Sequence, residues 1–377
     1  MTSKPFDSDF YLQSYPIVAR ELSRGDVSSP LEHYQTIGKG RGYLASPLAE
    51  RHYNADATTS TFGGLWPDHT MAPETLQRKL DSREITSEQA QQLTEWMRDG
   101  YTVLKNSISD GDLDAAAADL EKAYSGGFEK ALFECRKLNG KSNISWKPEV
   151  KEYNAKVLDL HHFSAAMRRI MFSPVIAEFL KLIFESNAFA AQTLGFWRGS
   201  GQEGHQDSAY VPFTLPRNFA ATWIALEDVT LGAGELFYYV GSHKFPDFLY
   251  GGKHKSIAEA ERLGYTVQRQ EIEAHVASLI KRASETNIDK TVFTAKRGDV
   301  LVWHADLVHG GNPVSKAITR KSFVTHYCPK ELSPLFSERM AIDLYGYRGN
   351  LMTSHLYRGG NVIDSGLLHR LRRLLNR

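Results

Sequence analysis

Apolar residues recur with different periods in the two halves of the chain. From about residue 86 to residue 186 they return every three or four positions, which is the spacing of helices with one buried face. Thr86 and Gln89 match a capping box, and Gly100 marks the end of the helix that they begin. We predict two further helices over 110–124 and 173–186, and a strand in "GYTVL" after the first helix.

From about residue 188 the pattern changes to short runs rich in aromatic and β-branched residues, separated by Gly, Pro and Asn. The runs are "AFAAQTLGFW", "FAATWIALEDV", "ELFYYV", "DVLVWH" and "RKSFVTHY". A charged, helical stretch over 256–285 interrupts them. The pattern predicts a mainly β fold with flanking helices (α+β), whose core is a jelly roll with a helical insertion.

The ends of the chain predict smaller units around this core. Apolar spacing near Val18 and Tyr34 indicates two short helices in an N-terminal module over 1–53, followed by a linker over 54–85. The core domain is expected over 86–335, and a C-terminal extension over 336–377 ends in the basic amphipathic helix "GLLHRLRRLLNR". We favour packing of this helix on the domain or on a neighbouring subunit over contact with a membrane surface.

Composition narrows the classes of function. The chain has 377 residues, 42% of them hydrophobic, and a net charge of +1, which gives no reason to expect nucleic acid as a partner. Cys135 and Cys328 are far apart, so a zinc–cysteine site or a disulfide scaffold is not expected. The first residues do not read as a signal peptide and no apolar run would span a bilayer, so we expect a cytoplasmic protein. The sequence does not predict an oligomeric state.

The triplet "HQD" is a candidate metal site. On an extended segment His205 and Asp207 point to the same face, and His309, which follows a predicted strand, is the candidate third ligand. Two imidazoles and one carboxylate with open positions form the metal site of non-heme Fe(II) oxygenases. The second triplet, "HAD", contains His304 and Asp306, which lie too close in sequence to His309 to take this role. We predict that they lie beside the site.

Arg320 and Ser322 open the last predicted strand and share one of its faces. A guanidinium binds a carboxylate with two parallel hydrogen bonds, and a hydroxyl adds a third. These two residues are therefore predicted to hold the far carboxylate of 2-oxoglutarate.

The order of these motifs resembles a known family. "HQD", "W.ALED", "G.GEL...VGSHK", "GDV" and "H.G..N.S...R.S" together resemble the phytanoyl-CoA dioxygenase family of Fe(II)/2-oxoglutarate-dependent oxygenases, over about residues 88–328. The resemblance implies a double-stranded β-helix (jelly roll, cupin-like), with iron at His205, Asp207 and His309. It also implies Trp223 beside 2-oxoglutarate, and we expect Gln192 to point into the same pocket. Val240 stands where the family usually has proline.

We therefore expect a dioxygenase that uses Fe(II), 2-oxoglutarate and O2 to hydroxylate a C–H bond, releasing succinate and CO2. Its substrate is expected to be a small molecule or a glycan- or lipid-linked one, because the N-terminal stretch is similar to a helical segment found in surface-polysaccharide proteins. Two alternatives stay open. One is a different oxidative reaction on the same scaffold, such as desaturation, epimerisation or cyclisation. The other is a binding protein without enzyme activity.

Overall fold

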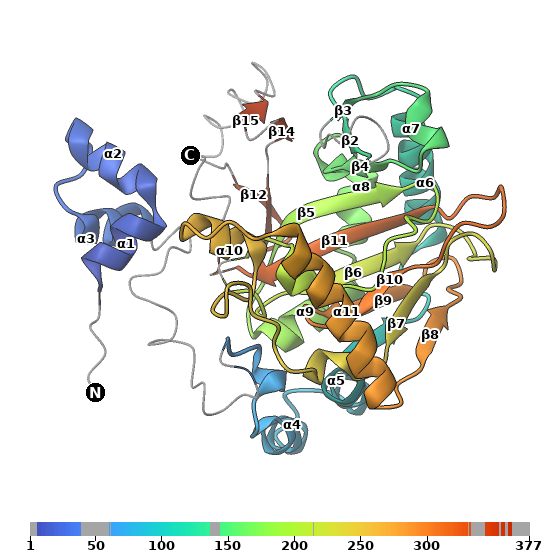
Figure 1. Cartoon of the computed structure of the whole chain (residues 1–377), viewed down its shortest axis with the longest axis horizontal. Coiled ribbons are helices and arrows are strands. Elements are labelled where there is room, and N and C mark those ends of the chain that lie inside the picture. The colour runs from blue at the N-terminus through green and yellow to red at the C-terminus, as the bar shows by residue number, and fades with distance from the viewer. Residues whose placement is uncertain are drawn as a thin grey trace.

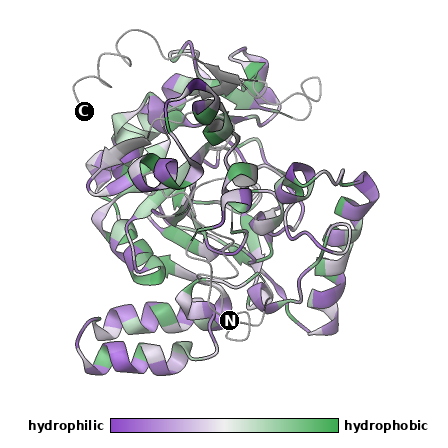
Figure 2. Ribbon diagram, turned by 90° about the vertical axis from the view of Figure 1, so that its left-hand side faces the viewer, coloured by the Kyte–Doolittle hydropathy of each residue, from purple (hydrophilic) through white to green (hydrophobic). Residues whose placement is uncertain are grey.

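The computed structural model describes residues 6–38, 60, 62–135, 144–213, 215–330, 332, 344–353, 356–358 and 361–363. Figure 1 shows β layers with helices packed around them, and the N-terminal helices to one side. In Figure 2 hydrophobic residues gather on the strands inside the molecule, whereas the helices around them carry both colours. The helices thus present one face to the core and the other to solvent.

The N-terminal module contains more helix than the sequence predicted. It consists of α1 (Ser8–Ser14), α2 (Pro16–Arg24), α3 (Pro30–His33) and a π-helical turn η1 (Tyr34–Gly38). The predicted pair of helices missed α1, whose buried positions are the aromatic residues Tyr11 and, just after its end, Tyr15. Aromatic side chains have only modest helix propensity, so tertiary packing around Tyr11, Tyr15 and Val18 stabilises this helix.

Part of the range 54–85, for which the sequence predicts a linker, is helical. It contains the short helix η4 (Trp66–Asp68) and the helix α4 (Ala72–Asp81). Pro73, which reads as a breaker in the sequence, lies in the first turn of α4, where proline is favourable. The indole Nε1–H of Trp66 donates to the carbonyl of Leu182 at 2.8 Å, which ties this segment to the domain.

The predicted helices of the first half are confirmed. They are α5 (Ser87–Asp99), α6 (Asp110–Tyr124) and α9 (Pro174–Phe184), with the short helices α7 (Glu149–Glu152), η5 (Leu160–His162) and α8 (Ala165–Met171) added. The side chain of Thr86 accepts from the backbone N–H of Gln89 as predicted, and Gly100 ends α5 with φ 81°. An apolar cluster containing Trp96, Leu120 and Phe179 packs these helices on one face of the sheet.

The large sheet contains four of the five runs predicted as strands after residue 188, and the fifth, "ELFYYV", lies in a second sheet. The order of the large sheet is β1-β9-β6-β11-β5-β4-β2-β3. The bounds are β1 (Tyr101–Leu104), β2 (Leu132–Glu134), β3 (Ile144–Ser145), β4 (Lys156–Leu158), β5 (Ala188–Phe196), β6 (Ala220–Ala225), β9 (Val300–His304) and β11 (Ser322–Pro329). Every pair along this path is antiparallel.

A smaller sheet faces the other side of the large one. It has the order β10-β7-β8, with β7 (Leu236–Tyr239), β8 (Lys290–Phe293) and β10 (His309–Gly311). A second apolar cluster, including Trp223, Leu236, Phe293 and Leu301, joins side chains of both sheets. The stretch between β7 and β8 forms the turn η7 (Ser242–Lys244) and the helices α10 (Ile257–Arg262) and α11 (Arg269–Glu285), so the helical prediction for 256–285 is confirmed.

The C-terminal part adds strands that the sequence did not indicate. β12 (Leu344–Tyr347) pairs with β13 (Asn350–Thr353), which pairs parallel with β5, and β14 (Leu356–Arg358) pairs with β15 (Asn361–Ile363). The predicted basic helix lies outside the described residues. Within the described ranges, no helix combines the length and apolar character needed to cross a membrane.

Candidate metal centre and its pocket

His205 and His309 lie opposite each other in a short antiparallel bridge. The backbone N–H of His205 donates to the carbonyl of His309 at 2.9 Å, and the reverse bond is 3.0 Å long. His309 begins β10 at the edge of the small sheet, so the bridge fastens the "HQD" segment to that sheet. Two residues that are distant in sequence therefore project neighbouring imidazoles, whose ring centroids are 4.5 Å apart.

The hydrogen bonds of both imidazoles define which nitrogen carries the proton, and Nε2 of His205 also lies 3.1 Å from the amide nitrogen of Gln202. Nδ1 of His205 lies 2.9 Å from the carbonyl of Glu203, and Nδ1 of His309 lies 2.9 Å from the carbonyl of Leu307. A carbonyl can only accept, so Nδ1 carries the proton in each ring and Nε2 presents a lone pair. This is the arrangement that orients histidine ligands at metal sites. Burial also lowers the pKa of His309 to about 4, which keeps its ring neutral.

Asp207 completes the group, with a local geometry that differs from the prediction. It is the first residue of the 3-10 turn η6 (Asp207–Ala209) and not part of an extended strand. Its Oδ1 lies 3.6 Å from Nε2 of His205 and 3.7 Å from Nε2 of His309. One ligand atom of each residue lies within 4.8 Å of the others. The turn thus brings the carboxylate to the face that the sequence argument assigned to it.

Two residues that the sequence analysis did not select hold the other oxygen of Asp207. The indole Nε1–H of Trp303 donates to Oδ2 at 2.9 Å, and Nε2 of His326 lies 3.3 Å from the same atom. Burial acts to raise the pKa of Asp207, but the imidazoles of His309 and His326 outweigh it and hold the pKa well below its usual range. The side chain is therefore a carboxylate whose Oδ1 is directed toward the two imidazoles. Trp303 is 96 residues from Asp207 in the sequence, so no local motif could have predicted this hydrogen bond.

A cavity of about 240 Å³ extends from these three residues to Arg320. Its wall comes from the inward faces of β5, β6, β9 and β11, and it includes Gln192, Trp223 and His326. Arg320 lies just before β11 and only 3% of it is exposed. The structure thus brings the predicted arginine, glutamine and tryptophan to the same cavity as the two histidines and the aspartate.

Arg320 is a buried cation without a carboxylate partner among the described residues. One Nη1–H donates to the carbonyl of Gly234 at 2.5 Å, while Nε has no partner there. The guanidinium lies 5.8 Å from the ring centre of Phe196 and 5.5 Å from that of Trp223. Burial lowers the pKa of Arg320 to about 10, so the group is still charged at neutral pH. Two further buried atoms without a partner, Oγ of Ser322 and Nε1 of Trp223, lie on the adjoining strands.

These unsatisfied groups fit an anionic ligand. A buried charge or polar donor without a partner is costly, and a carboxylate that accepts several hydrogen bonds removes that cost. The register places Ser322 opposite Phe196 and Ala225, so the hydroxyl starts the inward-facing row of β11. A diacid with one end at the His–Asp–His group and the other at Arg320 would lie along this row.

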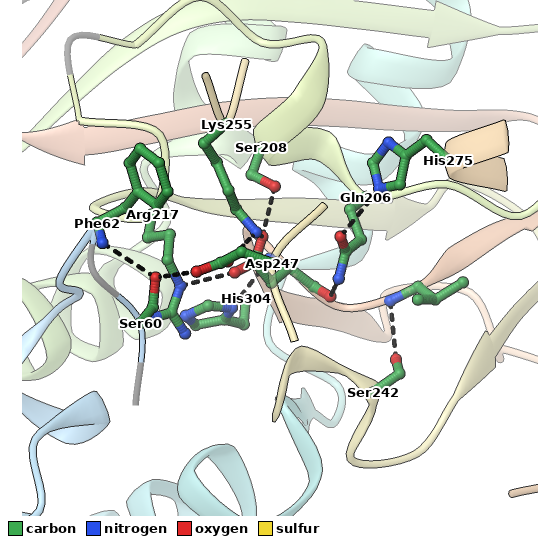
Figure 3. A network of polar contacts seen from close by, with 12 residues as sticks. Ser60, Phe62, Gln206, Ser208, Arg217, Ser242, Asp247, Lys255, His275 and His304 are labelled. Atoms are coloured by element: carbon green, nitrogen blue, oxygen red, sulfur yellow. Dashed lines mark hydrogen bonds and ion pairs between the residues drawn. The ribbon is translucent and has the colours of Figure 1, made fainter. Parts of the chain in front are cut away.

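The second triplet belongs to a buried ionic network behind the metal group. Arg217 and Lys255 pair with Asp306, at 2.6 Å and 3.0 Å, and Ser208 donates to the same carboxylate. Figure 3 shows Ser208, Arg217 and Lys255 pointing toward one another from three separate segments. His304 instead contacts Asp68, at 3.2 Å. The prediction that His304 and Asp306 lie beside the site agrees with this geometry.

A larger cavity of about 790 Å³ opens beside the first. Both cavities are lined by Glu134, Lys156, Phe196, Gln202 and His205, so they meet at the metal group. The helix α11 closes the far side of the outer cavity with Ile272, Glu273, Val276 and Ala277. The predicted insertion therefore forms a wall of the space in which a substrate would meet the metal.

The fold and the site define the class of enzyme: a non-heme oxygenase that depends on Fe(II), 2-oxoglutarate and O2. The sequence matches the phytanoyl-CoA dioxygenase (PhyH) family over residues 96–322, and the chain belongs to this family. The resemblance stated from the motifs is thereby confirmed, as are the enzyme class and its cofactors.

No curated protein matches the chain in sequence. Several solved structures are similar to it at low identity. The 2-oxoglutarate-dependent epimerase SnoN from nogalamycin biosynthesis is 17% identical, with a TM-score of 0.46 over 64% of this chain and 83% of its own. EctD from S. alaskensis, in its apoform, is 16% identical, with a TM-score of 0.46 over 65% and 77%. AviO1 from Streptomyces viridochromogenes Tue57 is 16% identical, with a TM-score of 0.44 over 66% and 99%.

Proposed function

We propose that the protein hydroxylates a C–H bond of a small molecule, with His205, Asp207 and His309 as the ligands of ferrous iron and Arg320 as the anchor of 2-oxoglutarate. Succinate and CO2 would be the products of the co-substrate. The observation that carries this proposal is one cavity with a preformed His–Asp–His group at one end and a buried, carboxylate-free arginine at the other. We interpret the two facing sheets as the two halves of a double-stranded β-helix.

The donor set fits iron. Two neutral imidazoles and one carboxylate leave open positions on the metal, and this combination suits ferrous iron that must also bind a co-substrate and dioxygen. When bound, the iron supplies the oxidising chemistry. The protein's part is to hold Nε2 of both histidines and Oδ1 of Asp207 on one side. The carbonyls of Glu203 and Leu307 and the indole of Trp303 orient these three ligands.

The other end of the cavity fits the five-carbon diacid. The guanidinium of Arg320 and the hydroxyl of Ser322 would hold its far carboxylate, and the flat face of Trp223 would border its carbon chain. Gln192 lies opposite His326 on β5, in the row nearest the metal group, where its amide can contact the near end. Arg320 forms no ion pair with a carboxylate of the described residues, although Glu235 interacts with it at longer range, so the ligand would provide its direct counter-charge.

We also propose a domain organisation for the chain. The helices α1–α3 form a unit within 1–53 whose core is Tyr11, Tyr15 and Val18, and Phe10 of α1 packs this unit against the domain cluster that contains Phe189 and Phe213. The oxygenase domain spans 86–335, and the helical segment 256–285 is its substrate-side wall.

Metal and co-substrate binding test the proposal without knowledge of the substrate. Anaerobic addition of Fe(II) and then 2-oxoglutarate should produce a weak visible charge-transfer band. The His205→Ala variant should neither bind iron nor show the charge-transfer band. Arg320→Ala should bind iron normally but need about ten- to a hundredfold more 2-oxoglutarate, the loss expected for a buried charge-assisted contact. His69→Ala, a histidine that lines neither cavity, is the matched control.

An unchanged band in both variants would contradict the assignment of the site. Once a substrate is found, isotope-labelled dioxygen separates the reactions, because a hydroxylated product retains one labelled oxygen atom. Epimerised, desaturated or cyclised products without label would show another oxidation on the same scaffold.

A further inference from the structure

Lys156 and Glu134 form an ion pair that faces the reaction space. They lie directly opposite each other on β4 and β2, with Nζ of Lys156 3.2 Å from Oε1 of Glu134. Both side chains line the inner and the outer cavity. Lys156 is also opposite Phe196, which in turn is opposite Ser322, so the pair continues the inward-facing row that begins at the proposed co-substrate anchor.

This ion pair contributes little to folding. Its side chains are 22% and 27% exposed, and exposed or half-exposed pairs of this kind stabilise proteins only slightly. A sheet could place apolar residues at this position, as it does one row further at Leu132 and Leu158, which also pair across β2 and β4. The presence of two opposite charges at the junction of the cavities is therefore better explained by what enters them.

The rest of the outer cavity's wall contains apolar and aromatic side chains, including Phe196, Tyr153, Tyr210, Ile272 and Val276, together with polar ones such as Asn154 and Gln202. The acidic residues of the wall other than Glu134 lie at the solvent-exposed rim, and one of them, Glu273, is paired with Arg269 at 2.7 Å. Among the described residues that line either cavity, two side chains carry a permanent positive charge: Lys156 and Arg320.

We propose that the substrate is a zwitterion, with an ammonium group that binds Glu134, a carboxylate that binds Lys156, and an apolar body that fills the outer cavity. The inference rests on the proposed function, since it names the substrate class of that same site. An amino acid with a large apolar side chain is the simplest molecule of this chemistry.

The charge balance of the pair selects a zwitterion over other ligands. A ligand with only a carboxylate would draw Lys156 away and leave Glu134 unpaired, and a ligand with only an ammonium group would do the reverse. A zwitterion gives each member of the pair an opposite charge and so exchanges one ion pair for two, whereas a singly charged ligand attracts one member and repels the other. A phosphorylated ligand such as an acyl-CoA would need several cations, and within the described lining Arg320 is already assigned to the co-substrate.

Equilibrium binding tests this directly. Anaerobic calorimetry with Fe(II) and 2-oxoglutarate present would compare L-leucine, L-phenylalanine and L-tryptophan with their methyl esters and their N-acetyl forms. We expect at least one free amino acid to bind about tenfold or more tightly than either blocked form, the effect of one charge-assisted contact. The same compound should stimulate succinate release above the level seen without substrate.

Two variants assign each charge to its partner. In Lys156→Met the preference for the free acid over its methyl ester should fall to about one, while the preference for the free amine over the N-acetyl form persists. In Glu134→Gln the preference for the free amine over the N-acetyl form should fall to about one, while the preference for the free acid over its methyl ester persists. Lys296→Met, which removes the exposed pair with Asp228 outside both cavities, is the matched control and should keep both preferences.

The outcomes separate this inference from the proposed function. If the charge-transfer band forms but none of the free amino acids binds, or if the blocked forms bind equally well, the zwitterion assignment is wrong and the oxygenase assignment stands. Preferences that fall equally in both variants would show a merely structural pair. Binding of an acyl-CoA or of a glycan-linked compound in place of the amino acids would also overturn it. Absence of the band would remove the proposed function itself.

Discussion

His205 and His309 exchange a reciprocal pair of backbone hydrogen bonds, of 2.9 and 3.0 Å, so the two imidazoles are positioned by the main chain. The metal group is thus built by the fold and does not need the metal to assemble it. This differs from small zinc domains, in which metal binding and folding are one event.

Removal of the metal should therefore leave the protein folded. We expect the far-ultraviolet circular dichroism of chelator-treated protein to match that of the iron-loaded protein. Anaerobic Fe(II) at about a hundredfold over its dissociation constant should add about 2.7 kcal/mol to the free energy of unfolding. Loss of secondary structure on chelation would show that the backbone bridge alone does not hold the site.

The indole of Trp303 donates to Oδ2 of Asp207 and leaves Oδ1 for the metal. Trp303→Phe keeps an aromatic ring beside His309 but removes this donor, so we expect iron affinity to fall about ten- to a hundredfold. Trp96→Phe is the matched control, because Trp96 is equally buried and its Nε1 has no hydrogen-bond partner in the described part of the chain. Fluorescence or calorimetric titration with Fe(II) under anaerobic conditions measures the iron affinity of both variants. Equal affinities in the two variants would contradict the role of the indole.

Gly310 follows the ligand His309 in β10 and has no room for a side chain. An added Cβ would lie 2.6 Å from the carbonyl oxygen of Gln202 and 2.6 Å from the ring of Phe237. Gly310→Ala should therefore shift the strand, lower iron affinity at least about tenfold and destabilise the protein by about 1–3 kcal/mol. Gly111→Ala, in an open position of α6, should bind iron normally and be slightly more stable, since alanine favours helix. An intact iron site in Gly310→Ala would argue against the close packing of β10.

Asp306 neutralises two buried cations, Arg217 and Lys255. Burial acts to raise the pKa of Asp306, but these cations outweigh it and hold the pKa far below its usual range. Asp306→Asn would remove the paired carboxylate of Arg217 and leave Lys255 with Asp247 alone, at 2.5 Å, and we expect a loss of about 3–5 kcal/mol in the free energy of unfolding. Asp228→Asn, which affects an exposed pair, should cost less than about 1 kcal/mol. Urea denaturation measures the free energy of unfolding of both variants. Equal losses would contradict the conclusion that burial makes the Asp306 network important.

Asp159 gives a prediction for pH dependence. Burial raises the pKa of this carboxyl from 3.8 to about 7, so the folded state keeps the proton to a higher pH than the unfolded chain does. Wild-type stability should therefore decrease as pH rises from about 4 to about 7 through this group. Asp159→Asn removes the titration, keeps an oxygen to accept from the backbone N–H of Thr193, and suits the left-handed φ of 48°. We expect the variant to gain about 1–2 kcal/mol over the wild type at pH 8 and much less at pH 4, because one pKa unit corresponds to about 1.4 kcal/mol and the residue is partly exposed.

The gain should be measured by urea denaturation at both values of pH. A gain that is the same at pH 4 and pH 8 would assign the effect to the backbone conformation alone. A variant less stable than the wild type at pH 8 would contradict the raised pKa.

Local signals predicted most of the elements that the structure contains in the domain. The capping residues Thr86 and Gly100 interact with residues a few positions away, so the sequence alone predicts the ends of this helix. Elements held mainly by distant contacts were missed. β4 has three residues, and β13 joins the sheet only through its pairing with β5, so neither carries a pattern of its own. The helix α4 was hidden by a proline that reads as a breaker unless its place in the first turn is known.

The order and types of His205, Asp207, His309 and Arg320 were enough for the sequence alone to indicate an iron- and 2-oxoglutarate-dependent chemistry, because metal and carboxylate ligands must be particular side chains. Only the tertiary structure decided which oxygen of Asp207 is free, since Trp303 and His326 reach the other from β9 and β11. It also decided that Lys156 and Glu134 meet at the entrance to the site, because two short strands in register bring them together. Such contacts depend on long-range pairing, and no spacing along the chain encodes them.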